Sequence, residues 1–142
     1  MANTEPSMLE KWFTAVWNKK NENAIDELMD SQADIIDKKP LKKYKGTSHI
    51  KLVYKKLQSM FDDIKIEPEK VHKDGDIEIA YCNVSAFYKR KEIKFRRQAM
   101  VRVKNNKIVE ASNNFDLELY KRAEKMEKSG ALDQLVKSSA KD

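Results

Sequence analysis

The sequence is poor in the residues that stabilise small secreted and zinc-binding domains. It has a single cysteine, Cys82, so no disulfide can form within the chain. Its two histidines, His49 and His72, are too few for a zinc site of cysteine and histidine ligands. Cys82 itself is expected to be a small buried residue and not a nucleophile. We therefore expect neither a metal nor a cofactor.

Long apolar runs are also missing. No run approaches the roughly 20 residues that a membrane span needs. The first residues, MANTEPSMLEK, lack the charged and then apolar layout of a signal peptide. These absences predict a cytoplasmic protein without a membrane partner.

Glycine and proline are scarce, with three of each, and the glycines fall at the ends of expected elements. Gly46 ends the lysine-rich stretch 37–46 (DKKPLKKYKG), which we expect to be a surface loop. Gly75 belongs to a turn at 73–76, and Gly130 stops a C-terminal helix.

The charge is basic but mixed, because 29 Lys and Arg against 23 Asp and Glu give a net charge of +6. Most of the cations are lysines, which favours a well-solvated surface over a phosphate-binding groove. The stretch 37–46 contains no arginine, one aromatic residue (Tyr44) and no recognisable nucleic-acid motif. We predict no nucleic-acid partner.

The apolar content suffices for one domain. At 142 residues and 40% apolar composition, the chain can bury a single core. We expect that domain to span residues 1–137, followed by a disordered tail over 138–142.

The segment 92–119 is predicted to form two long strands joined by Asn105 and Asn106, because adjacent asparagines tolerate the positive φ of a tight hairpin turn. Placing Lys104 opposite Lys107 fixes the register and both faces. One face then pairs Val103 with Ile108, Val101 with Glu110, Ala99 with Ser112, Arg97 with Asn114, and Phe95 with Asp116. Such a half-apolar face is typical of a ligand pocket, and also of a core with a few satisfied polar groups.

A second predicted hairpin precedes this one, with its turn at 90–91 and Lys89 opposite Glu92. Alternate residues of the segment 80–88 then extend the same buried face. The opposite face mixes polar residues with Met100, Val109, Ala111 and Phe115. That mixture is typical of a modest dimer or partner interface.

Helical signals precede these strands. Ser7 and Glu10 have the spacing of a capping box before an aromatic helix face. Asn23 opens a second helix, and residue 47 or 48 caps a third, which carries an apolar stripe from Ile50 to Phe61.

Three further elements complete the expected order. Residues 33–36 form a short strand, Pro68 makes 64–68 an edge strand, and a C-terminal helix begins at Leu119. The order predicts an α+β domain in which three N-terminal helices pack on one side of a strongly bent antiparallel sheet, forming a cone.

Four segments in this order resemble the SnoaL-like branch of the nuclear transport factor two-like superfamily, over nearly the whole chain. They are FTAVWNKKN followed by IDELM, the helix GTSHIKLVYKKLQSMFDDIKI, the Gly-Asp turn into a long strand, and MVRVKNNKIVEASNNFD.

The resemblance implies a cone-shaped α+β barrel with a pocket between the sheet and the N-terminal helices, and often a homodimer formed through the outer sheet face. Family members include polyketide cyclases, ketosteroid isomerases, dehydratases and epoxide hydrolases. In the cyclase pattern, the acidic residue of the last strand matches Asp116. The pattern's tryptophan falls at Ser112 and its histidine at Ala99, so cyclase activity does not carry over directly.

The candidate site follows from that face. Asp116 is the candidate acid/base, because an apolar environment disfavours its ionised form; a salt bridge or strand-end cap is the alternative. Arg97 can hold an oxyanion or pair internally with Asp116 or Glu110. The remaining candidate ligand contacts are Ser112, Asn114, Trp12, Trp17, Tyr54 and Phe95.

Three functions remain open on this evidence. The first is binding of a small apolar or aromatic organic molecule in the cone. The second is an isomerase, dehydratase or cyclase that uses Asp116, which the substitution Asp116→Asn would separate from simple binding. The third is a dimeric interaction module that uses the outer sheet face.

Overall fold

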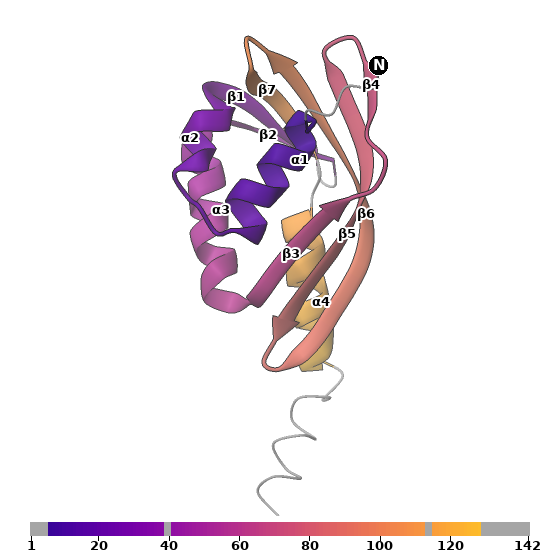
Figure 1. The fold of residues 1–142 in the computed structure, drawn as a ribbon. Coiled ribbons are helices and arrows are strands. Elements are labelled where there is room, and N and C mark those ends of the chain that lie inside the picture. The colour runs from indigo at the N-terminus through magenta and orange to yellow at the C-terminus, as the bar shows by residue number, and fades with distance from the viewer. Residues whose placement is uncertain (1–5, 39–40, 113–114, 129–142) are drawn as a thin grey trace, which may run out of the picture.

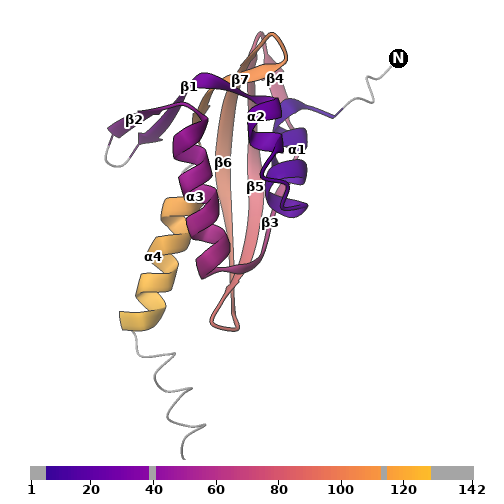
Figure 2. The ribbon, with the colours of Figure 1, turned by 90° about the vertical axis from the view of Figure 1, so that its left-hand side faces the viewer.

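The computed structural model describes residues 6–38, 41–112 and 115–128. It is an α+β fold in which helices lie against one face of a curved sheet (Figures 1 and 2). The helical elements are α1 (Met8–Trp12), the π-helix η1 (Phe13–Asn18), α2 (Ala24–Leu28), α3 (Thr47–Met60) and α4 (Phe115–Lys128). The strands are β1 (Met29–Lys38), β2 (Leu41–Lys45), β3 (Asp62–Pro68), β4 (His72–Asp74), β5 (Ile77–Tyr88), β6 (Lys91–Lys104) and β7 (Lys107–Ser112).

The sheet is mixed. Its order is β2-β1-β7-β6-β5-β3, with β4 also paired to β5. Strand β1 runs parallel to β7, and the other pairs are antiparallel. The predicted α+β cone with N-terminal helices on one side is confirmed, whereas a purely antiparallel sheet is wrong at the β1–β7 pair.

Two sets of hydrogen bonds hold the start of α1. As predicted, Ser7 and Glu10 form a capping box, in which Glu10 N–H donates to Ser7 Oγ and Ser7 N–H donates to Glu10 Oε1. In addition, Glu78 of β5 accepts hydrogen bonds from the backbone N–H groups of Met8 (3.2 Å) and Leu9 (2.9 Å). A strand carboxylate therefore anchors the first turn of the helix to the sheet.

The aromatic helix continues as a π-helix. Lys19 N–H donates to Thr14 O at 2.8 Å, five residues back. In this geometry residues five apart lie nearly above one another, and Trp12 and Trp17 have this spacing. Both indoles therefore face the sheet, with exposed fractions of 4% and 1%.

The edge strand β3 is covered by a side chain of η1. Asn18 Nδ2 donates to Ile66 O (2.9 Å), and Ile66 N–H donates to Asn18 Oδ1 (2.7 Å). The amide thereby supplies both hydrogen bonds that a neighbouring strand would have supplied. The predicted edge position of this strand is confirmed.

The central hairpin follows the expected register only beside its turn. Asn105 and Asn106 have positive φ, and Lys104 pairs with Lys107 and Val103 with Ile108, as predicted. A β-bulge then shifts the register by one residue, so that Arg102 pairs with Glu110, Val101 with Ala111, and Met100 with Ser112. The predicted pairs Val101 with Glu110 and Ala99 with Ser112 are wrong.

The last strand is shorter than expected. It ends at Ser112, and helix α4 begins at Phe115. Phe115, Leu119 and Ala123 are spaced by four and are all buried, which is the pattern of a helix face. Asp116 therefore lies in the first turn of α4, and its predicted pairing with Phe95 is wrong.

Two other expectations for the C-terminal part change as a result. Ala111 and Phe115 belong to the core, with exposed fractions of 8% and 5%, and not to the outer sheet face. Asn114, Gly130 and the tail 138–142 lie outside the described residues. The domain limits 1–137 and the expected homodimer stay predictions.

The hairpin of β5 and β6 turns at Lys89 and Arg90, both with positive φ, and not at 90–91. Tyr88 pairs with Lys91, so every partner is displaced by two residues. A shift of two preserves the side-chain faces. Accordingly, the alternate residues Ala80, Cys82, Val84 and Ala86 are buried as predicted.

The stretch 37–46 is not a loop, because β1 and β2 form a hairpin there in which Ile36 pairs with Lys43. Gly46 precedes α3 with φ +83°, and a Cβ at this position would clash with the carbonyl oxygen of Ser31. A glycine is therefore required where the chain passes from β2 into α3.

Within the described residues, no helix is long and apolar enough to cross a membrane.

Candidate functional site

A small cavity lies where four helical elements meet the sheet. Its walls come from α1 and η1 (Trp12, Trp17), β1 (Met29, Ile35, Ile36), α3 (His49, Ile50, Val53), β7 (Ala111, Ser112) and the first turn of α4 (Phe115, Asp116). Its volume is about 30 Å³, which is room for about two water molecules. The protein's own side chains fill most of the cone.

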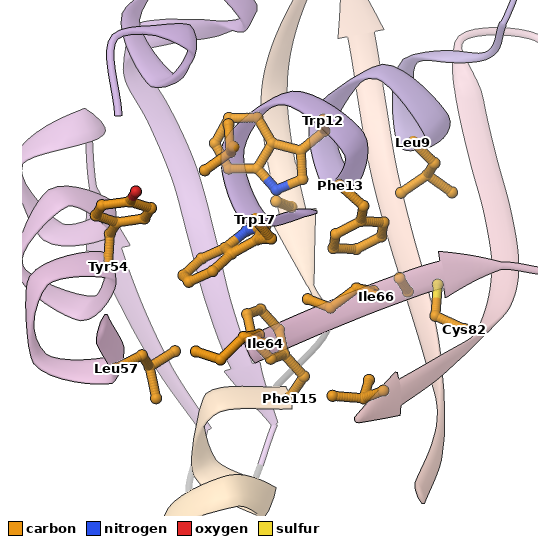
Figure 3. Close-up of a cluster of buried hydrophobic side chains, with 14 of the residues drawn as sticks. Leu9, Trp12, Phe13, Trp17, Tyr54, Leu57, Ile64, Ile66, Cys82 and Phe115 are labelled. Atoms are coloured by element: carbon orange, nitrogen blue, oxygen red, sulfur yellow. The ribbon is translucent and has the colours of Figure 1, made fainter. Parts of the chain in front are cut away.

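Three aromatic residues, Trp12, Trp17 and Phe115, line this cavity, and Figure 3 shows their side chains within the buried cluster. Phe115 meets Trp17 edge-on, with ring centroids 4.9 Å apart and planes at 85°. Tyr54 packs on the other side of Trp17 at 5.3 Å, behind the cavity wall. Edge-on and tilted pairs are the favourable geometries for aromatic rings, so the wall is well packed.

One indole of that wall has an unsatisfied hydrogen-bond donor. Trp17 is 1% exposed, and its Nε1 has no hydrogen-bond acceptor among the described residues. Burying such a donor without a partner costs about 1–3 kcal/mol. Among the described side chains, Gln58 Nε2 shares this condition, whereas Asp34 Oδ1 lies 3.3 Å from Lys45 Nζ; neither residue lines the cavity.

Three further polar side chains face the same space. Ser112 is 6% exposed, at the end of β7. Asp116 enters from α4, and His49 enters from the first turn of α3. The cavity therefore combines an apolar wall with a hydroxyl, a carboxyl, an imidazole and an indole N–H.

His49 was missed by the sequence reasoning, which placed it at a helix start without a role. Its ring stacks on Tyr44 of β2, with centroids 3.9 Å apart and planes at 3°. The signal was present, because His49 lies four residues before Val53 on the apolar stripe of α3. The partner Tyr44 was not recognisable, since 37–46 was expected to be a loop.

The family model for the SnoaL-like domain matches residues 9–111. This chain belongs to the SnoaL-like family. The match covers α1 through β7 almost completely and confirms the predicted family. It ends before α4, so it does not support equating Asp116 with the acidic residue of the cyclase pattern.

Solved structures show the same fold. A putative polyketide cyclase from Acidithiobacillus ferrooxidans is 17% identical, with a TM-score of 0.69 over 88% of this chain and 99% of that chain. A putative SnoaL-like polyketide cyclase from Jannaschia sp. is 12% identical, with a TM-score of 0.68 over 85% and 96%. A protein of ketosteroid isomerase-like fold from Catenulispora acidiphila, in complex with trimethylamine, is 17% identical, with a TM-score of 0.68 over 78% and 85%. No curated protein matches the sequence.

The SnoaL-like fold of this chain brings four of the predicted site residues together: Trp12, Trp17, Ser112 and Asp116. Arg97 does not line the cavity and lies in the middle of β6, where its Nη1 donates to Glu118 Oε1 at 3.2 Å. An internal ion pair of the kind expected for Arg97 is therefore present, and it is made with Glu118.

Phe95 is also outside the cavity. Its ring lies beneath the guanidinium of Arg122, whose Cζ is 5.1 Å from the ring centroid. Phe95 and Arg97 lie outside the cavity for the same reason. Helix α4 occupies the inner side of β6, where the sequence predicted a paired strand. Ligand binding by the predicted residues stays a prediction.

Burial accounts for the two most perturbed titrating groups. It raises the pKa of Tyr120 to about 12, with Asp116 nearby adding to the shift. Burial also raises the pKa of the Cys82 thiol to about 12, so this residue remains protonated, consistent with the expected core role. Within the described part of the chain, no group of His, Cys, Asp and Glu side chains has a metal-binding arrangement.

Proposed function

We propose that this SnoaL-like chain binds a small, largely apolar organic molecule that carries a hydrogen-bond acceptor, such as a carbonyl oxygen. The observation that carries the proposal is the buried Nε1 of Trp17, which has no hydrogen-bond partner among the described residues, on a side chain that lines the cavity. An acceptor placed there would remove the cost of the unsatisfied donor. The apolar wall would contribute through burial of the ligand's surface.

The other polar groups define what surrounds that acceptor. Ser112 and His49 can each donate a further hydrogen bond, and the rings of Trp12 and Phe115 suit a flat apolar body. The presence of trimethylamine in the Catenulispora protein supports small-molecule binding as a use of this fold. The cavity of about 30 Å³ must widen before an organic molecule of this kind can enter.

A matched pair of ligands tests the role of Trp17. Acetophenone and α-methylstyrene have nearly the same shape, because a C=CH₂ group replaces the C=O group, but only acetophenone carries a hydrogen-bond acceptor. We expect wild-type protein to prefer acetophenone by about threefold to tenfold, the usual contribution of one hydrogen bond. Trp17→Phe keeps an aromatic ring without the N–H group and should abolish this preference in a titration followed by NMR.

The control for that experiment is Trp12→Phe, which changes the other cavity tryptophan. Trp12 Nε1 is not among the buried unpaired atoms, so the preference for acetophenone should persist in this variant. A preference that survives Trp17→Phe would contradict the assigned hydrogen bond. Absence of binding of both compounds to wild-type protein would overturn the proposal for ligands of this class.

Proton transfer at the same cavity is a second candidate function. The observation that favours it is that a carboxyl group, Asp116, and an imidazole, His49, line one cavity. Such a pair can act as general acid and base on a bound molecule. In the variant Asp116→Asn, binding would persist while turnover of any substrate would collapse, and unchanged turnover would exclude catalysis by Asp116.

A further inference from the structure

We propose that α4 is a displaceable plug, which closes the cone when docked and opens the cavity when it leaves the sheet as a unit. Phe115 and Asp116, in its first turn, form one wall of the cavity. Removing α4 therefore removes that wall. The kind of molecule that enters the open cavity rests on the proposed function, whereas the undocking of α4 does not.

The buried face of the plug is formed by apolar side chains. Phe115, Leu119 and Ala123 are buried along one face of α4, with exposed fractions of 5%, 0% and 3%. Phe115 also lies edge-on to Phe13 at 6.4 Å, in addition to its contact with Trp17. Contacts of this kind are non-directional, so they can be replaced by contacts with an apolar ligand.

The outer contacts of the plug are charged: those of Glu127 lie at the surface, and the Glu118–Arg97 pair is partly buried. Glu118 pairs with Arg97 (3.2 Å), and Glu127 accepts hydrogen bonds from Lys89 (2.7 Å) and from the hydroxyl of Tyr88 (2.9 Å). Exposed ion pairs contribute little individually. The plug is thus held at its rim by a few weak interactions.

The sheet does not depend on α4 for the pairing of its strands. All seven strands pair with one another, and α4 follows the last strand without joining the sheet. The figures show α4 beside the end of the sheet that carries the β5–β6 turn, away from α1 and α2 (Figures 1 and 2). The family match, residues 9–111, likewise ends before this helix. An element with these properties can undock while the remainder stays folded.

The two tryptophans make opening measurable without a ligand. Trp12 and Trp17 are the only tryptophans of the sequence, and both line the cavity. Quenching of their fluorescence by acrylamide therefore reports access to the cone. Hydrogen exchange, measured by mass spectrometry, reports separately on the amides of α4 and of the sheet.

The test variant is Glu118→Gln combined with Glu127→Gln, which removes the ion pairs of α4 with Arg97 and Lys89. The control is Glu124→Gln, because Glu124 pairs with Lys128 inside α4 and touches no other element through that pair. We expect the double variant to raise the open fraction, and with it the quenching constant, by about fivefold. The control should match the wild type.

Hydrogen exchange supplies the decisive comparison. In wild-type protein the α4 amides should exchange faster than those of β5 and β6, and the double variant should accelerate α4 alone. Exchange of α4 only together with β5 and β6 would overturn the proposal, and so would equal quenching in the double variant and the control. Failure of acetophenone to bind would affect the proposed function and leave these ligand-free measurements intact.

Discussion

Glu78 shows how one residue links the N-terminal helix to the sheet. Its side chain is 7% exposed and accepts two backbone N–H groups of α1, while Lys73 Nζ lies 4.0 Å away. These N–H groups have no partner inside their own helix, so the carboxylate satisfies donors that would otherwise be buried and unpaired. The alternation of β5 places Glu78 on the same buried face as Ala80, and only the tertiary contact reveals its role.

Replacing Glu78 by glutamine should destabilise the protein by about 1–3 kcal/mol, because one carboxylate oxygen becomes an amide NH₂ group that faces a backbone donor. The free energy of unfolding in urea measures this loss. The control Glu92→Gln removes an exposed carboxylate that lies 3.7 Å from Lys94, and it should change stability little. A Glu78→Gln protein as stable as the control would contradict the anchoring role.

The sequence predicted the positions of some site residues better than those of others. Trp12 and Trp17 were predictable because their spacing and aromatic character mark a buried helix face. Asp116 reached the cavity for a different reason from the predicted one, since it comes from a helix and not from a strand paired with Phe95. Placing His49 in the site required knowledge that the first turn of α3 lies beside Tyr44 of β2.

At the scale of helices and strands, two irregular elements shape the site. The π-helix turns Trp17 onto the same side as Trp12, and the bulge in β7 turns Ala111 into the core beside Ser112. Both irregularities insert one residue into a regular repeat. Each depends on contacts made by neighbouring elements, so neither is marked by a local sequence signal.

The edge strand β3 depends on an element far from it in sequence. We expect Asn18→Ala to leave Ile66 N–H and C=O without their partners and to cost about 1–3 kcal/mol of stability. Hydrogen exchange of the Ile66 amide, read by NMR, should accelerate markedly. The control variant Asn83→Ala removes an exposed amide that donates a hydrogen bond to the Glu69 side chain. The Ile66 amide should stay protected in this control. Unchanged protection in Asn18→Ala would show that the amide does not cover this edge.

At the scale of the whole molecule, carboxylates spread over the surface share one electrostatic tendency. Hydrogen bonds from Arg96 lower the pKa of Glu69, and those from Lys89 lower the pKa of Glu127. The bond from the Ser7 backbone lowers the pKa of Glu10, and the bond from Lys51 lowers the pKa of Asp26. All four groups are held ionised by the fold.

These pKa shifts predict how the stability of the fold decreases at acidic pH. A folded-state pKa below the unfolded value gives stability that is present above the unfolded pKa, about 4, and is lost as the pH falls through the folded pKa. Thermal unfolding should therefore be steady from neutral pH to about pH 5 and decline below about pH 4. Glu69→Gln should make that decline shallower, and an equally steep decline would contradict the contribution of this pair.

The sequence by itself determined the elements that local chemistry specifies. The capping box at Ser7, the Asn105–Asn106 turn, the stripe of α3 and the alternation of 80–88 each depend on residues a few positions apart, and each was predicted correctly. These elements, in this order, were enough to give the α+β cone and its family.

Tertiary structure alone decided how the cone is filled. The parallel pairing of β1 with β7 coincides with the bulge, since Asp34 and Ile35 lie beside Glu110 and Ala111. The segment from Phe115 became a helix because its spacing by four could be buried against Trp17 and Phe13. Such choices depend on which surfaces meet across the fold, and the free energy of burying them is absent from any short stretch of sequence.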